Sequence, residues 1–166
     1  MSFGGEAKAD AGTLRARDWP CLRQFGIFME NRVGTLHELL RHIERHDLRI
    51  MALTIVDSVD FSIARVILNN YERALELFQL SDFNFFETDL IGVELSNDPQ
   101  PYVKICIALL QAELNIHYTY PLLYRSSKGH GAIALYVDDI EMGIKTLVDK
   151  GHRIVTENDL LEYDEY

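Results

Sequence analysis

Residues 27–36 read Ile-Phe-Met-Glu-Asn-Arg-Val-Gly-Thr-Leu, and this stretch joins a segment with strand-like alternation to one with helical spacing. Over Leu22–Met29 the apolar side chains alternate, as in a strand with one buried face. The positions on that face are Phe25, Ile27 and Met29. Downstream, the apolar residues recur with the period of an amphipathic helix, at Leu36, Leu39, Leu40 and Ile43. The stretch therefore predicts a strand, a tight turn and a helix.

The pattern continues with two β-rich segments, a second helix and a further strand. Leu48–Val56 and Phe61–Leu68 are expected to be strands joined by a hairpin loop. Asn69-Asn70 is typical of a helix start, and the apolar residues of the helix that follows are Ala74, Leu75, Leu77 and Phe78. A strand opens at Phe85–Glu87. This order of elements is that of a ferredoxin-like βαββαβ unit.

The same pattern returns in the second half of the chain when the numbering is shifted by about 66 residues. Apolar positions meet apolar positions, such as Leu39 with Ile105, Ile43 with Leu109 and Leu48 with Leu114. The second copy is expected to have strands near 115–124 and 131–137, a helix over 139–149, a C-cap glycine at Gly151, a short strand over 152–155, and a last helical turn opened by Thr156 with Asp159.

The sequence therefore predicts an α+β fold of two ferredoxin-like βαββαβ modules, with antiparallel sheets and helices on one face. The first module is expected over residues 21–91 and the second over residues 92–166, after a flexible N-terminal tail over residues 1–20. Such sheets leave one face and their edges uncovered. Pairing between modules, and a homodimer that completes the sheets, are the expected remedies.

Charge and composition exclude several classes of protein. The net charge of −10 leaves no basic surface for nucleic acid. No apolar run approaches the roughly 20 residues that span a bilayer, and residues 1–11 lack the apolar segment of a signal peptide. The two cysteines form no metal or redox motif, and we expect Cys106 to be buried and Cys21 to be exposed. A cytoplasmic protein without disulfides or membrane contact is expected.

The opening stretch also resembles the start of an ACT domain, in which an apolar strand leads through an acidic residue, Asn and Pro-Gly to Leu. Residues 52–61 (ALTIVDSVDF) resemble the second strand and hairpin of the tandem ACT proteins of bacteria, and residues 115–120 (NIHYTY) resemble the matching strand of their second copy. The likeness extends from Leu22 to Leu161. It implies a regulatory protein without a catalytic domain, which binds a free amino acid or a related small metabolite between modules.

The chemistry of the opening stretch fits such a ligand. Gly34 is expected to begin a helix, where unpaired N–H groups attract a carboxylate and the missing Cβ allows close approach. Asn31 offers a donor and an acceptor, and Glu30 offers a partner for an ammonium. The alternative is that Gly34 and Asn31 are only turn and cap residues. The predicted ligand-binding residues are Glu30, Asn31, Val33, Gly34, Thr35, Leu36, Asn97, Gln100, Tyr118 and Tyr120, with no cofactor and no metal.

The two copies are not expected to bind equally. Val33 replaces the usual proline of the first loop, but the glycine after it is kept. Gln100 stands where the second loop should have its glycine, and prolines on both sides stiffen that loop. We therefore expect one functional loop around Gly34 and a degenerate one around Gln100. Tyr118 and Tyr120 either line the ligand side chain or pack against the helices.

Two other functions remain as alternatives. Residues 129–141 (GHGAIALYVDDIE) resemble a half-module of the glyoxalase and dioxygenase superfamily, in which His130 would bind a divalent metal with a glutamate and a second histidine. Ala64 stands opposite His130 in the first copy, which weakens this interpretation. The face shared by Glu38, His42 and His46 is interpreted as a solvated polar face and not as a zinc site. A protein that binds only a partner through a sheet edge is the third possibility.

Overall fold

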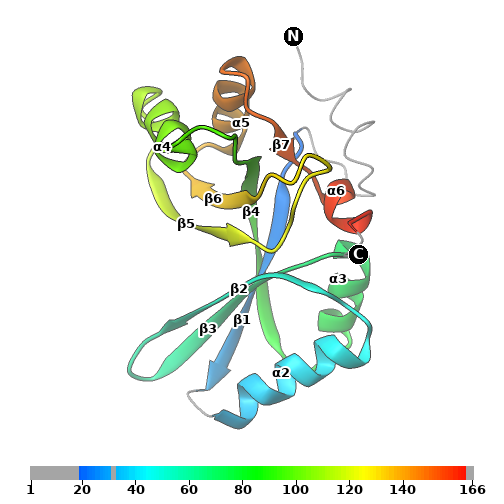
Figure 1. The fold of residues 1–166 in the computed structure, drawn as a ribbon. Coiled ribbons are helices and arrows are strands. Elements are labelled where there is room, and N and C mark those ends of the chain that lie inside the picture. Colours follow the sequence, from blue (N-terminus) through cyan, green and yellow to red (C-terminus); the bar gives the residue numbers. More distant parts are fainter. Residues whose placement is uncertain (1–18, 31–32, 164–166) are drawn as a thin grey trace. The chain divides into compact units, whose positions relative to one another are not determined.

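The computed structural model describes residues 19–30 and 33–163 (Figure 1). The described chain forms two compact units: Arg23–Thr88 on the one hand, and the described parts of Met1–Leu22 and Asp89–Tyr166 on the other. The boundary at residues 88/89 falls inside strand β4 (Asn84–Glu94). This strand therefore supplies residues to both units. The module boundary expected from the sequence, at residues 91/92, lies in the same strand.

The Arg23–Thr88 unit has the predicted βαββαβ order. Its elements are β1 (Leu22–Glu30), α2 (Val33–Arg45), β2 (Ile50–Asp57), β3 (Phe61–Leu68), α3 (Tyr71–Gln79) and the first part of β4. The strands lie in the order β2-β3-β1-β4, with β3 antiparallel to both β1 and β2. This is the strand order of a ferredoxin-like module, so the predicted fold of the first copy is confirmed.

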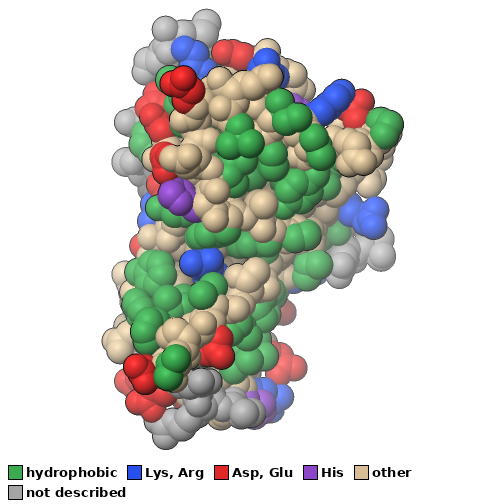
Figure 2. All heavy atoms as spheres, turned by 90° about the vertical axis from the view of Figure 1, so that its left-hand side faces the viewer, with side chains coloured by type: hydrophobic (Ala, Val, Ile, Leu, Met, Phe, Trp, Pro, Cys, Tyr) green, Lys and Arg blue, Asp and Glu red, His purple; other side chains and the backbone are tan. Residues whose placement is uncertain are grey.

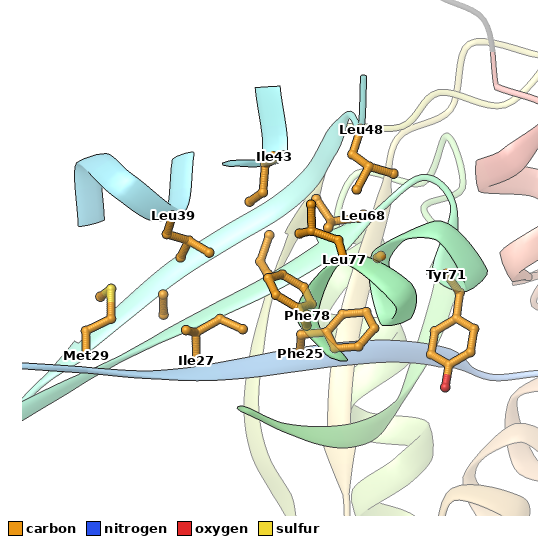
Figure 3. Close-up of a cluster of buried hydrophobic side chains, with 13 residues drawn as sticks. Phe25, Ile27, Met29, Leu39, Ile43, Leu48, Leu68, Tyr71, Leu77 and Phe78 are labelled. Carbon is orange, nitrogen blue, oxygen red and sulfur yellow. The ribbon is translucent and has the colours of Figure 1, made fainter. Parts of the chain in front are cut away.

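Both helices of this unit pack on one face of its sheet. The alternating residues Phe25, Ile27 and Met29 of β1 lie in the buried cluster beneath them, together with Leu39 and Ile43 of α2 (Figure 3). The ring of Phe25 is at the centre of an aromatic group. Its centroid lies 5.6 Å from that of Tyr71, 4.9 Å from that of Phe78 and 6.0 Å from that of Phe85. The predicted apolar faces of strand and helix therefore meet.

The second unit repeats this arrangement and uses the end of β4 as its first strand. Its other elements are α4 (Pro101–Gln111), β5 (Ile116–Leu122), β6 (Ala132–Val137), α5 (Ile140–Asp149), β7 (Ile154–Val155) and α6 (Glu157–Leu161). Strand β4 pairs antiparallel with both β6 and β7, and β6 pairs antiparallel with β5. The order β5-β6-β4-β7 is the same as β2-β3-β1-β4 in the first unit, so the second predicted module is confirmed as well.

Two expectations near the N-terminus need correction or restriction. Cys21 is 3% exposed and lies in the buried cluster of the second unit, so the prediction of an exposed thiol was wrong. Trp19 packs against the same cluster. Residues 1–18 of the expected tail lie outside the described residues.

Cys106 is partly buried on α4, and this desolvation raises the pKa of its thiol.

Local signals in the sequence place several helix ends. The Asn70 side chain accepts a hydrogen bond from the backbone N–H of Arg73, which caps α3 as expected. Thr156 and Asp159 form a reciprocal capping box at the start of α6. Gly151, just beyond α5, has a φ of 84°, a conformation that residues with a Cβ rarely adopt. In the described parts of the chain, no helix is both long and apolar enough to cross a bilayer.

Gly26 of β1 provides a test of the sheet packing. A Cβ at this position would overlap the ring of Phe86, which lies over the glycine on the sheet face opposite the helices. We expect Gly26→Ala to reduce the free energy of unfolding by about 1–3 kcal/mol, measured by urea denaturation. The same substitution in a Phe86→Ala background should cost much less. An equal loss in both backgrounds would contradict the packing described here.

Candidate functional site

Gly34 is the second residue of α2, and neither its backbone nor its packing requires a glycine. Its φ lies outside the left-handed region, and a Cβ built at this position would meet none of the described residues within 4 Å. Alanine in a helix is more stable than glycine by about 0.5–1 kcal/mol. The explanation of Gly34 as a turn glycine therefore finds no support in the described geometry. What the glycine does provide is open space next to the first turn of a helix.

A groove of about 360 Å³ lies beside this helix start. Three segments line it: the end of β1, the first half of α2, and the turn that leads from α3 into β4. The lining residues are Phe28, Glu30, Thr35, Glu38, His42, Leu80, Ser81, Asp82, Phe83 and Asn84. Pockets for small ligands begin at roughly this volume. Two of the predicted residues, Glu30 and Thr35, belong to the groove.

The turn after α3 is held by its own hydrogen bonds. The Ser81 hydroxyl donates to the carbonyl of Phe78 at 2.9 Å and accepts from the N–H of Phe83 at 3.2 Å. Phe83 packs against the buried cluster of the unit. These contacts fix the turn in one place. Asp82 and Asn84, on either side of Phe83, are thereby held as part of the groove wall.

The charge of the groove is dominated by carboxylates. Among the described residues that line the groove, Glu30, Glu38 and Asp82 come from three different segments, and His42 is the one basic side chain. His42 is positioned from two directions: its Nε2 lies 4.0 Å from Oε1 of Glu38, and its ring meets that of Phe83 edge-on, with 5.6 Å between centroids. The carboxylates attract a cationic group such as an ammonium.

The structure gives different places to the remaining predicted residues of the first loop. Asn31 lies outside the described residues, and Val33 is known only as the first residue of α2. The Leu36 side chain packs against the buried cluster of the unit and so helps to hold α2 on the sheet. Within this loop, Glu30 and Thr35 are thus the described residues that line the groove, and Gly34 directly precedes Thr35 in the chain.

The second loop differs from the first at the start of its helix. Gln100 precedes α4 and makes no side-chain cap hydrogen bond. Pro101 is the first residue of the helix, and because proline has no N–H, α4 begins with one donor fewer than α2. Asn97 and Gln100 are both exposed in the segment before α4.

Tyr118 and Tyr120 lie on β5 of the second unit, on the face opposite its helices. The residue between them, Thr119, has its hydroxyl 2.6 Å from the Tyr102 hydroxyl of α4, so the neighbours of Thr119 point the other way. The two rings stack with centroids 6.2 Å apart, and the Tyr118 ring also lies 5.3 Å from that of Tyr136. Packing of these tyrosines against the helices, one of the two expectations, is therefore not observed.

Sequence reasoning missed several residues of the groove, above all Asp82 and Asn84. Glu38 and His42 had been noticed, but only as a polar helix face. A topological signal was available, because the fourth strand of a ferredoxin-like unit runs antiparallel to the first. The turn before the fourth strand therefore lies at the same end of the sheet as the turn after the first (Figure 1). A polar turn such as residues 80–84 could have been placed there.

His130, the metal ligand of the alternative function, takes part in a buried ionic network. Its Nδ1 lies 2.8 Å from Oε1 of Glu94, which is 9% exposed, and the guanidinium of Arg153 donates to Oε2 of Glu94 at 3.0 Å. Arg153 also reaches Asp159 at 3.4 Å. Both carboxylate oxygens of Glu94 are thus engaged, one by His130 and the other by Arg153. The described residues contain no group of three or more ligating side chains that could hold a metal.

Comparison with known proteins agrees with this architecture. The sequence matches a family described as "ACT domain pair" over residues 21–163, and the chain therefore belongs to this family. It is similar to the solved structure of protein BT0572 from Bacteroides thetaiotaomicron, at 23% identity and a TM-score of 0.76, covering 86% of this chain and 97% of that one. No curated protein matches the sequence significantly.

A second similar structure is the ligand-free regulatory subunit of aspartate kinase from Thermus thermophilus, at 10% identity and a TM-score of 0.55. The match covers 80% of this chain and 94% of that subunit. At such identities the likeness concerns the fold. Membership of the ACT family supports a ligand-binding regulatory role and points to a regulatory protein rather than an enzyme.

The Glu94 network makes stability depend on pH. Burial by itself raises the pKa of Glu94, but hydrogen bonds from His130, Arg153 and Ser126 outweigh burial and lower it. The stabilising contribution is therefore present above the unfolded pKa of about 4.3 and is lost as the pH falls through the lower folded value. We expect the free energy of unfolding to decrease as the pH falls below 5, and to decrease less in Glu94→Gln than in the wild type. Urea denaturation at each pH measures this difference.

Asp98 and Asp138 also have lowered pKa values, Asp98 through hydrogen bonds to Ser96 and Lys104, and Asp138 through one to His117. Each of these aspartates makes the same contribution to the pH dependence of unfolding in the wild type and in Glu94→Gln. The difference between the two proteins therefore isolates the network. Identical slopes would show that Glu94 is not held in its charged form by these partners.

Proposed function

We propose that this protein is a regulatory amino-acid-binding protein, and that its ligand binds in the groove beside Gly34. The observation that carries the proposal is the unstrained glycine at the start of α2, whose chain neighbour Thr35 lines a groove of about 360 Å³. A glycine that meets no described side chain leaves the backbone of the first helical turn accessible to a ligand.

The two ends of a zwitterionic amino acid match the two kinds of surface. The first-turn N–H groups of α2, with the positive end of the helix dipole, suit a carboxylate. The carboxylates of Glu30, Glu38 and Asp82 suit the ammonium. Each hydrogen bond to a charged group contributes about 1.5–3 kcal/mol, so a few of them support micromolar affinity after the cost of association. The exposed ring of Phe28 offers an apolar contact.

The regulatory role needs no catalytic group in this chain. Binding changes the stability and packing of the module, and a partner that senses this change completes the response. We propose a homodimer as the working assembly, and we expect the second loop, around Gln100 and Pro101, to take little or no part in binding.

A thermal-shift screen with the twenty amino acids tests the proposal. At least one is expected to raise the unfolding temperature, because a ligand at 100 times its dissociation constant stabilises the folded state by about 2.7 kcal/mol. Gly34→Ala should leave the unliganded protein as stable or slightly more stable, and should weaken binding by about tenfold or more in calorimetric titration. Glu30→Gln should weaken it as well.

The matched control is Gln100→Ala at the start of α4, which is expected to bind as tightly as the wild type. Binding that survives Gly34→Ala but is lost with Gln100→Ala would move the site to the second module. If no amino acid stabilises the wild type, the proposed ligand class is wrong.

A further inference from the structure

The outer surface of α4 is apolar, although it faces away from the core. Val103, Ile107 and Leu110 are 47%, 47% and 56% exposed, while Ile105 and Leu109 of the same helix are fully buried. At 100° per residue, the three exposed side chains form one narrow stripe along the helix. Figure 2, which faces the side of the molecule where α4 lies in Figure 1, shows hydrophobic side chains gathered on the upper part of that face.

The internal repeat provides a control for this observation. A shift of 66 residues places Val103, Ile107 and Leu110 on the positions of His37, Arg41 and Glu44 in α2. These three residues are exposed, and Arg41 pairs with Glu44 at 2.9 Å. The module therefore folds with an ordinary charged surface at these positions. An apolar stripe on α4 alone indicates a contact that α2 does not make.

We propose that α4 is the interface between two copies of this chain, packed as an antiparallel helix pair around a two-fold axis at Ile107. This inference rests on the proposed homodimer, but not on ligand binding. The stripe fits itself: Val103 lies four residues before Ile107 and Leu110 three residues after it. In an antiparallel pair, Ile107 meets Ile107 of the other copy, and Val103 meets Leu110 in both directions, as an isologous contact requires.

The charges on α4 favour the same arrangement. The chain carries a net charge of −10, which repels a second copy over most of its surface, but α4 contains no acidic residue. Its one charged residue, Lys104, lies in the first half of the helix and pairs with Asp98 at 3.0 Å, and Glu113 follows the C-terminus of the helix. An antiparallel pair brings the Lys104 half of one helix toward the Glu113 end of the other. The two helix dipoles also oppose each other favourably.

The size of the stripe sets the expected strength. An 11-residue helix is about 16 Å long, and a stable interface buries roughly 800 Å² per copy. The stripe alone supplies less than this area, so the dimer is expected to dissociate on dilution. Residues 1–18 are a poor alternative cover, because Met1, Phe3 and Leu14 are their only large apolar side chains.

Sedimentation velocity of the full chain over a dilution series tests the proposal. The wild type is expected to change from dimer to monomer on dilution, and Ile107→Glu is expected to be monomeric throughout. The matched control is Arg41→Glu at the equivalent position of α2, which should behave as the wild type. Circular dichroism and the unfolding temperature check that each variant is folded. A monomeric wild type, or a dimer unaffected by Ile107→Glu, would overturn the interface.

A charge pair tests the two-fold geometry itself. Val103→Glu and Leu110→Lys are each expected to weaken the dimer at least tenfold. Combined in one chain, they should restore it, because each introduced acid then meets an introduced base of the other copy. Failure of this rescue would rule out the antiparallel register, even where the single variants dissociate the dimer.

Cross-linking provides a readout that does not depend on affinity. In a Cys106→Ser background, Ile107→Cys is expected to form a disulfide-linked dimer on mild oxidation, because the two-fold axis brings the two thiols together. Arg41→Cys in the same background should not. Both assembly experiments are made without ligand. A negative thermal-shift screen would therefore contradict the ligand proposal and leave the interface standing, and the reverse also holds.

Discussion

Strand β4 has to serve two sheets, and this constraint shapes the rest of the fold. Its first residues complete the sheet of the Arg23–Thr88 unit, and its last residues pair with β6 on one side and β7 on the other. Leu90, Ile91 and Val93 are fully buried as a consequence. The strand ends on Glu94, whose buried carboxylate contacts His130 and the cationic guanidinium of Arg153.

Apolar periodicity made most of this architecture predictable. The strand face of Phe25, Ile27 and Met29 predicted the first sheet, and the 66-residue repeat predicted the second. Carried one step further, that repeat places Phe25 and Ile27 on Ile91 and Val93, which are buried in the second unit as their counterparts are in the first. The double role of β4 was therefore present in the pattern. The strand was instead expected only as a short segment opening at Phe85–Glu87.

The candidate site was less predictable, for a physical reason. A buried face leaves a periodic signal, whereas the carboxylates of Glu30, Glu38 and Asp82 come from separate solvent-facing positions and become neighbours only when the chain folds. The burial of Cys21 was not predicted for a related reason: the residues that pack against Cys21 are distant from it in the sequence. Arg153 was missed as well. The resemblance to the glyoxalase and dioxygenase superfamily implied a glutamate and a second histidine beside His130, and nothing in the sequence indicated an arginine.

Because one strand belongs to both modules, the protein cannot be dissected at a linker. A fragment that stops after the first module would still carry the end of β4, but without β6 and β7 beside it. The unpaired N–H and C=O groups of that segment, together with its apolar side chains, would form an exposed edge strand that is prone to aggregation. Conversely, a fragment that begins with the second module would lose the residues that anchor the same strand upstream. We therefore expect single modules to aggregate when they are expressed alone. Insertions in the loop at residues 57–60, by contrast, leave the shared strand intact.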